Sequence, residues 1–432
     1  MTLNKTKVII IIAISLGFVY RIYLSSLAQS QPIFDMSAYH KYATAIAAGN
    51  LVTDCCLWNV GYSAFLGTIY KLFGSDNINA VRTAQSIIDV STAFLIYLIA
   101  VEKLGKKSAF FSFLLYLTNP LTSSYTGLRL GEIITIFYIT LLTYIVTRKT
   151  FRKNFLLWLI TGIILGLLLF TKQSLFYFVI ALTFTIGFLI LKRLNKFLFI
   201  IISFAGIIIA SSYTLSANYK NFKKISLVPP YNNAWTQLYT SFYYSHWPEI
   251  DSDYGEFKSL SQGYIQPWTE YKNATLVQKL ELEEKNKKLF LRKLQKDWLL
   301  FIGNTTRNII WIWDKTHLYY YHDPFYPQDK LIIRVMNILW LVLFIIGFTA
   351  YIKKNSGKIM NQELFLITIL LFLYVTFFFT LVNNEQRLSL YFYPFIFLFG
   401  GLGITHIIDT IRRIRFFSEA HYSVWPFRSS DR

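Results

Sequence analysis

Charged residues are scarce in this chain of 432 residues, and cysteine, methionine and histidine are scarcer still. Only 15% of the residues carry a formal charge, against about 25% in soluble domains, which excludes a disordered protein and a coiled coil. Two cysteines cannot build the disulfide framework of a small secreted protein. Hydrophobic residues instead make up 54% and aromatic residues 18%, so the composition favours one polytopic membrane domain with a smaller polar insert.

Long apolar runs divide the chain into candidate membrane spans. A stretch of about 18 or more apolar residues predicts a transmembrane helix. The sequence offers ten, over residues 8–26, 81–101, 109–122, 131–147, 155–171, 174–191, 197–217, 331–352, 364–381 and 391–408. The third is short and ends near Asn119-Pro120, so we expect it to be kinked or incomplete. The predicted fold class is an all-α polytopic membrane protein with amphipathic helices in its outer loops.

The basic residues predict an orientation for these spans. The chain holds 43 basic and 23 acidic residues, a net charge of +20. With the N-terminus inside, the inner loops and the parts of the tails next to the spans hold 18 Lys and Arg, whereas the short outer turns hold only Arg129, Lys172 and Arg387. Because cytoplasmic loops are enriched in Lys and Arg, both termini are predicted to be cytoplasmic. The basic excess is therefore topological, and no nucleic-acid partner is expected.

The first span has an alternative interpretation. Lys5 and Lys7, a short apolar core and Ser26-Leu27-Ala28 resemble a cleavable signal peptide. Cleavage would leave the topology of the remaining spans unchanged.

Two predicted outer segments are large. The first, about 29–80, joins the first two spans, and the second, about 218–330, is a polar insert. The predicted organisation is an N-terminal transmembrane bundle over 1–217, an extracytoplasmic insert over 218–330, and C-terminal transmembrane helices with a short cytoplasmic tail over 331–432. Periodic apolar residues in the insert predict a helix over 275–301 that lies on the membrane or against the bundle.

Ionisable residues gather at the outer ends of the spans. Such residues are costly near lipid and mark functional sites by default. The set consists of Arg21, Asp35, Arg82, Arg129, Glu132, Lys172, Glu385 and Arg387. The inner ends carry only ordinary basic loops, so the asymmetry predicts an anion-binding cavity that opens outward.

Each candidate has a structural and a chemical interpretation. Asp35 can cap the short helix that follows it, or act as a carboxylate base on an attacking hydroxyl. Lys172, in a tight turn between two spans, can extend its ammonium to the membrane surface or bind phosphate. Arg387 can pair with Glu385 or bind a phosphate through its guanidinium.

Two further points concern Glu132 and metals. Glu132 follows Arg129 by three residues, so the two can simply pair along one helix end. No H-E-x-x-H, no spaced Cys or His cluster and no G-x-S-x-G occurs in the sequence. No cofactor or metal ligand is therefore predicted, although a divalent metal would be compatible with the sequence.

The sequence resembles the membrane-embedded glycosyltransferases of the GT-C fold. The nearest group is similar to glycosyltransferase family 39, the bacterial relatives of protein O-mannosyltransferases and lipid A aminoarabinose transferases. The matching elements, clearest over 35–142, are the Tyr- and Ala-rich segment from Asp35 to Gly49, Gly61-Tyr62, Tyr70 to Gly74, Arg82, Gln85, Asn119-Pro120, Glu132 and, later, Glu385-Gln386-Arg387 before Tyr391 to Pro394. Met36, the missing prolines beside Gly61-Tyr62, and Lys172-Gln173 depart from the family pattern.

The resemblance implies a hexosyl- or pentosyltransferase that uses a polyprenyl-phosphate sugar donor at the outer face of a bacterial inner membrane. Asp35 would deprotonate an acceptor hydroxyl on an envelope glycolipid, glycan or protein, with inversion at the sugar carbon. Lys172, Arg387 and Arg82 would hold the donor phosphate. The remaining site candidates are Glu132, Arg129, Tyr62 and Glu385.

Three other functions compete with this interpretation. A transporter or flippase of lipid-linked sugars would favour inverted repeats, which are not visible. An O-antigen polymerase or ligase would also use outer-face arginines, but without the Asp-x-x-x-Tyr segment after the first span. A non-catalytic envelope scaffold would not require ionisable residues at so many outer helix ends.

Overall fold

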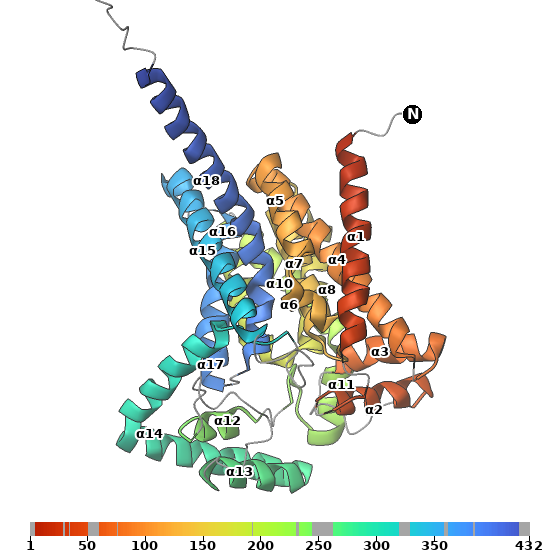
Figure 1. The fold of residues 1–432 in the computed structure, drawn as a ribbon. Helices are drawn as coiled ribbons and strands as arrows, with labels where there is room; N and C mark the ends of the chain where they lie inside the picture. Colours follow the sequence, from red (N-terminus) through yellow and green to blue (C-terminus); the bar gives the residue numbers. More distant parts are fainter. Residues whose placement is uncertain are drawn as a thin grey trace, which may run out of the picture.

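The computed structural model of the chain consists of α-helices, and the residues it describes contain no β-strand (Figure 1). These residues are 5–28, 31–33, 35–50, 60–75, 77–191, 193–229, 233–243, 262–318, 329–357, 362–382 and 385–422. The first half contains α1 (Lys5–Leu27), α2 (Asp35–Ala47), α3 (Val60–Phe73), α4 (Ile78–Lys103), α5 (Lys106–Leu117), α6 (Pro120–Tyr125), α7 (Glu132–Thr147), η1 (Phe151–Lys153), α8 (Phe155–Thr171), η2 (Gln173–Leu175), α9 (Phe176–Thr185), η3 (Ile186–Ile190), α10 (Arg193–Ala210) and α11 (Ser212–Phe222). The second half contains α12 (Ala234–Thr240), α13 (Gln262–Asn273), α14 (Leu276–Trp313), α15 (Asp329–Asn355), α16 (Glu363–Leu373), η7 (Tyr374–Phe378), α17 (Phe379–Val382), η8 (Gln386–Phe392) and α18 (Tyr393–Tyr422).

Apolar helices form the body of the molecule, so the prediction of a multi-pass, all-α membrane protein is confirmed. Six stretches among the described residues are long and apolar enough to cross a membrane, namely Val8–Leu27, Ile78–Lys103, Gln173–Ile190, Lys330–Asn355, Glu363–Leu381 and Gln386–Ile414. A seventh is reached if the bent pair α10–α11 is one span. The expected number of ten is not confirmed, because α7 and α8 have only 16 and 17 residues and two other expected spans are broken.

Local sequence explains the first of these breaks. The expected span 109–122 divides because α5 ends at Leu117 and α6 begins at Pro120, which has no backbone N–H to continue a helix. Asn119 caps the new helix, and its side-chain oxygen accepts the backbone N–H of Leu121 at 2.9 Å. The expected span 197–217 bends by 66° between α10 and α11.

Glycines allow the closest approach of helices in the bundle. A Cβ at Gly162 of α8 would lie 2.2 Å from the carbonyl oxygen of Ser203 in α10, and one at Gly206 would lie 2.7 Å from the backbone of Ile163. A Cβ at Gly347 of α15 would lie 1.9 Å from the carbonyl oxygen of Phe399 in α18. Because lipid provides no hydrophobic drive between helices, such backbone-to-backbone packing is what holds the pairs together.

A fully buried ion pair joins α1 to the bundle. Arg21 Nε donates to Asp89 of α4 at 2.6 Å, and both side chains are 0% exposed. The Tyr116 hydroxyl donates to the other oxygen of Asp89 at 2.5 Å, while Arg21 also donates to the carbonyl oxygens of Gly17 and Leu117. The sequence grouped Arg21 with the outer-end residues, whereas the structure uses it to cross-link α1, α4 and α5.

The two ends of the bundle differ in character. The start of α1 and the end of α18 lie at one end, whereas α2, α3 and α12–α14 lie at the other (Figure 1). The helix expected over 275–301 is present as α14 and begins with a capping box between Thr275 and Gln278. It continues to Trp313, further than expected, and has a non-helical residue at Asp297 (φ −122°, ψ 34°). Residues 244–261 and 319–328 of the expected insert lie outside the described part.

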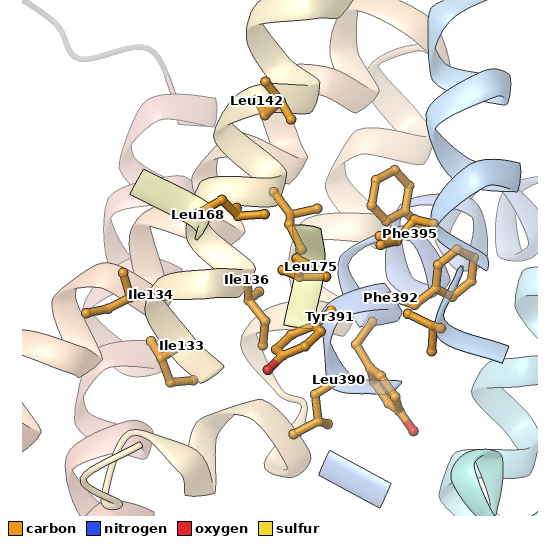
Figure 2. Packing of buried hydrophobic residues seen from close by; sticks show 14 of the residues in the cluster. Ile133, Ile134, Ile136, Leu142, Leu168, Leu175, Leu390, Tyr391, Phe392 and Phe395 are labelled. Carbon is orange, nitrogen blue, oxygen red and sulfur yellow. The ribbon is translucent and has the colours of Figure 1, made fainter. Parts of the chain in front are cut away.

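A dense apolar cluster packs around η8, the segment that carries Arg387. Figure 2 shows Tyr391 beside Ile136, with Leu390 just below it in this view. All seven residues of η8 are buried, so the backbone of this 3₁₀ turn is held within the core. The packing sets η8 against the first turns of α7, where Glu132 lies.

Candidate functional site

Arg387, at the start of η8, is the centre of a charged cluster. Its Nη2 donates to the Asp35 carboxylate at 2.5 Å, and its Nε donates to Glu385 and lies 3.5 Å from Glu132 Oε1. Three carboxylates from three distant parts of the sequence therefore meet one guanidinium. Such a fork of donors is also suited to the oxygens of a phosphate.

Lys172 supplies a second cation to the same cluster. It occupies the extended residue between α8 and η2, with φ −145° and ψ 90°, which turns its side chain out of the helix. Its ammonium lies 3.3 Å from Glu132 Oε1 and 6.0 Å from the centre of the Tyr391 ring. Glu132 thus bridges Lys172 and Arg387, two cations from distant parts of the sequence.

Burial separates the cluster into an inner and an outer part. The side chains of Arg387, Lys172 and Glu132 are 3%, 8% and 1% exposed, whereas those of Asp35 and Glu385 are 25% and 24% exposed. The two cations are therefore almost completely shielded from solvent, whereas the carboxylates of Asp35 and Glu385 are partly accessible to it. Ion pairs in such surroundings are much stronger than at an open surface.

Asp35 reaches the cluster from the first residue of α2. The position agrees with the expected helix start, and the acidic residue lies in the first helical turn, where the helix dipole favours a negative charge. Asp35 therefore lies in the first turn of α2 and belongs to the charged cluster, whereas its role as a base stays a prediction.

Tyr62 lies behind this arrangement, on α3. Its hydroxyl donates to Gln85 Oε1 at 3.0 Å, and Gln85 in turn donates to the carbonyl oxygens of Thr126 and Leu128. The ring of Tyr39 from α2 meets the ring of Tyr62 edge-on at 5.0 Å. The network fixes the loop before α7 and hence the position of Glu132.

Gly61 accounts for the closeness of α3 and α8. A Cβ at this residue would lie 2.8 Å from the carbonyl of Phe170, two residues before Lys172. Any larger side chain would push α3 away from the turn that carries Lys172.

The two remaining arginines of the predicted set lie at the neighbouring helix ends. Arg82, near the start of α4, donates to the carbonyl oxygen of Ala28 at 2.8 Å and lies 3.4 Å from Asn79 Oδ1. Arg129 is buried in the loop before α7, close enough to Tyr62 to act on its hydroxyl electrostatically. The structure therefore brings Asp35, Glu132, Lys172, Glu385 and Arg387 into direct contact and gives Arg82 a different set of partners.

The surroundings of Glu385 change the pKa of its carboxyl group. Burial raises the pKa of the Glu385 carboxyl above its usual value, although the Arg387 guanidinium beside it acts in the opposite direction. A raised pKa means that Glu385 holds a proton more readily than a carboxyl in water.

Two residues near the cluster were absent from the sequence prediction. Tyr391 is fully buried and its hydroxyl has no hydrogen-bond partner among the described residues. Lys315 is buried at the end of α14, and its ammonium donates to the carbonyl oxygen of Gln386. Tyr391 could have been found from its place next to the late charged motif, whereas nothing in the sequence around Lys315 connects it to residue 386.

The carboxylates of the cluster do not form a metal site. Within the described ranges, no group of three or more His, Cys, Asp or Glu side chains could hold a metal ion. The carboxylates of the cluster are instead turned toward Arg387 and Lys172. The present arrangement of these residues does not fit a metal, and no chemical step is derived through one.

Comparisons with known proteins extend this description. Residues 60–215 match the family model described as dolichyl-phosphate-mannose-protein mannosyltransferase. The matched segment contains Tyr62, Arg82, Arg129, Glu132 and Lys172. No curated protein matches the chain in sequence.

Solved structures share the fold. The archaeal oligosaccharyltransferase AglB of Archaeoglobus fulgidus, in complex with an inhibitory peptide and a dolichol-phosphate, has a TM-score of 0.53 and 12% identity, covering 96% of this chain and 52% of that one. The same organism's oligosaccharyltransferase tethered to an acceptor peptide has a TM-score of 0.54 and 13% identity, covering 94% of this chain and 50% of that one. The chain thus spans about half the length of these proteins. The chain has the GT-C fold of membrane glycosyltransferases, and its residues 60–215 match the mannosyltransferase family model.

Proposed function

We propose that the protein is a membrane glycosyltransferase that moves a sugar from a polyprenyl-phosphate donor to a hydroxyl acceptor. The observation that carries this proposal is the cluster in which the buried cations Arg387 and Lys172 share the Glu132 carboxylate, and in which Asp35 pairs with Arg387. A phosphate on a lipid needs buried cations next to apolar helices, and a hydroxyl nucleophile needs a nearby base. The family match over 60–215 supports the same activity.

Donor binding would rearrange the ion pairs of the cluster. The donor phosphate would replace Asp35 and Glu385 on the guanidinium of Arg387, because its oxygens match the same fork of donors. Lys172 would bind the same phosphate from the Glu132 side. The exchange would release the Asp35 carboxylate, which is partly accessible to solvent, to face the acceptor.

The transfer itself would be a single displacement. The acceptor oxygen attacks the anomeric carbon of the sugar while Asp35 takes the proton from that oxygen. The bond between this carbon and the phosphate oxygen breaks, and its electron pair leaves with the polyprenyl phosphate. Arg387 and Lys172 stabilise the charge that develops on the leaving phosphate. Attack from the side opposite to the phosphate inverts the configuration.

We place the acceptor on the side of the α12–α14 helices. These helices lie at the end of the bundle that holds the charged cluster (Figure 1). Residues 218–330 would form the extracytoplasmic insert between the transmembrane parts 1–217 and 331–432. The excess of basic residues in the predicted inner loops supports an outer location for the site, in a bacterial inner membrane. The acceptor would be an envelope glycolipid, a glycan or a protein.

A transfer assay tests the function directly. Membranes that contain the full-length protein are incubated with a panel of polyprenyl-phosphate sugars and extracted envelope glycolipids, and labelled products are counted. Transfer from at least one donor is expected. Lys172→Ala and Arg387→Ala should weaken binding of the donor at least tenfold, because each removes a buried cation from the phosphate.

The matched control is Lys107→Ala. Lys107 is a half-exposed lysine that pairs with Asp409 at the opposite end of the bundle, so its removal should leave donor binding as it is. Unchanged donor affinity in both Lys172→Ala and Arg387→Ala would overturn the phosphate assignment. Movement of intact lipid-linked sugar across vesicles, without any transfer, would instead favour a flippase.

A further inference from the structure

A group of three hydrogen bonds joins the end of α14 to the turn that carries Arg387. The Lys315 ammonium donates to the carbonyl oxygen of Gln386, and the Gln386 side-chain amide donates back to the carbonyl oxygen of Asp314 at 2.5 Å. The Ser389 hydroxyl donates to the carbonyl oxygen of Ile312 at 2.6 Å. We call residues 312–315 together with Gln386 and Ser389 the α14–η8 clasp.

The clasp holds the backbone on both sides of Arg387. Gln386 precedes the arginine, and Ser389 follows it by two residues. Each is bound to backbone or side-chain atoms more than seventy residues earlier in the sequence. A guanidinium presented by a short 3₁₀ turn depends on its backbone for direction, since such turns are poorly stabilised by their own hydrogen bonds.

Burial of the Lys315 ammonium costs free energy that a purely packing role would not explain. It is 3% exposed, and burial lowers the pKa of its ammonium well below the usual value. The neighbouring Asp314 carboxylate accepts two hydrogen bonds from Arg334 at 2.8 Å, so the charge of Asp314 is already shared with another cation. An apolar side chain would fill the same space without the cost of burying a charge.

The clasp is further held from the other side of α14. Trp313 Nε1 donates to Thr376 Oγ1 at 3.2 Å, and Asn337 of α15 donates to the carbonyl oxygen of Trp313 at 2.7 Å. The end of α14 is therefore fixed to η7 and α15, and can serve as a rigid base for η8.

We propose that Lys315 is a positioning residue that holds the backbone carbonyl of Gln386, so that Arg387 is directed at the donor phosphate. The inference rests on the proposed function for the identity of the ligand, but its structural part concerns the order of η8 alone. Lys315 acts through Arg387 and needs no contact with the donor.

The test compares three variants of the full-length protein in lipid nanodiscs. Lys315→Met removes the donor group and the charge while keeping an unbranched side chain, and Lys315→Arg restores a charged donor. Lys285→Met is the matched control, because Lys285 is a half-exposed lysine of α14 that pairs with Glu270. Binding of polyprenyl phosphate without a sugar and hydrogen exchange of the backbone amides over 385–392 are measured.

In Lys315→Met, we expect polyprenyl-phosphate binding to weaken about tenfold, the effect of one lost charge-assisted hydrogen bond transmitted to the binding group. The amides of η8 should exchange at least tenfold faster, because their anchor is gone. Lys315→Arg should recover most of both effects, and Lys285→Met should resemble the wild type. In transfer assays the KM for the donor should rise while the KM for the acceptor stays the same, whereas partial unfolding would lower the maximal rate and leave both KM values unchanged.

Other outcomes decide the proposal as well. Wild-type binding together with wild-type exchange in Lys315→Met would overturn it. If that variant fails to fold, Ser389→Ala removes the hydroxyl that donates to the carbonyl oxygens of Ile312 and Gln386 and should still accelerate exchange of η8, and unchanged exchange would again overturn the proposal. If the wild type binds no polyprenyl phosphate, the proposed function fails, and the exchange measurement alone decides the role of Lys315.

Discussion

Asp35→Asn should have opposite effects on turnover and on donor binding. The substitution keeps the shape of the side chain but removes both the base and the negative charge that occupies Arg387. Loss of a general base lowers the rate of the chemical step by roughly 10² to 10⁴. At the same time, a competitor for the guanidinium of Arg387 disappears, so the donor phosphate should bind more tightly.

The size of the gain in affinity follows from the ion pair. Two unit charges about 4 Å apart interact by about 4 kcal/mol at an effective dielectric constant near 20. The Asp35 side chain is 25% exposed, so solvent screening reduces this considerably, and pairs at fully exposed sites contribute at most about 1 kcal/mol. We expect a value near that limit, about 1 kcal/mol, which corresponds to a donor affinity roughly fivefold higher.

The assay separates the two effects by measuring each on the same purified sample. Binding of polyprenyl phosphate is measured by competition in nanodiscs, and turnover is measured with the donor that the wild type uses. Asp409→Asn is the control, since it makes the same chemical change in an ion pair at the far end of the bundle. Turnover within threefold of the wild type, or weaker donor binding in Asp35→Asn, would refute the reasoning.

Three further predictions concern stability. Arg21→Leu should lower the unfolding free energy by about 3–5 kcal/mol, because it leaves the Asp89 carboxylate buried without its cation, and the double variant with Asp89→Leu should regain most of the loss in a thermal unfolding assay. Burial and the nearby Lys330 and Arg334 lower the pKa of His317 to about 4, so its folded form stays neutral where the unfolded form binds a proton. The stability of the wild type should therefore fall by up to about 3 kcal/mol as the pH drops from about 6.5 to 4. If the melting temperature of His317→Asn declines as much as that of the wild type over this interval, the assignment is contradicted. Gly162→Ala should destabilise the α8–α10 pair by about 1–3 kcal/mol through its clash with Ser203, whereas Gly303→Ala, with open space around its Cβ, should melt no lower than the wild type.

Much of the fold could be predicted from the apolar runs. In lipid, every backbone polar group must be satisfied within its own segment, so a long apolar stretch leaves few alternatives to a helix. Residues 8–26 and 331–352 accordingly lie within α1 and α15. The number of spans was less predictable, because hydropathy does not report where Pro120 begins a new helix or where α10 bends into α11.

The charged cluster was partly visible in the sequence for a similar reason. Topology alone predicted that Asp35, Glu132, Lys172 and Arg387 share one end of the bundle, and the structure brings them into contact. Their catalytic and binding roles stay predictions. Arg21 shows the limit of the argument, since charge position along a span does not reveal its partner. The signal for that partner was nevertheless present in Asp89, an ionisable residue inside an apolar run.

Lys315 could not have been predicted in this way. Its importance arises from an approach between α14 and η8 that no local pattern records, because the two segments are about seventy residues apart. Contacts of a side chain with a distant backbone carbonyl leave no periodicity and no motif. Only the tertiary arrangement identifies such residues.

The buried pair between Arg21 and Asp89 has a consequence for biogenesis. A carboxylate near the middle of a membrane helix, as Asp89 is in α4, costs about 2.5–3.5 kcal/mol during insertion, and pairing with Arg21 offsets this cost once α1 and α4 lie side by side. We therefore expect α4 to insert more favourably when α1 is already beside it, with the Tyr116 hydroxyl of α5 completing the site afterwards. A signal peptidase that removed α1 would strand the Asp89 carboxylate in hydrocarbon, so the first helix is expected to be retained as a permanent member of the bundle.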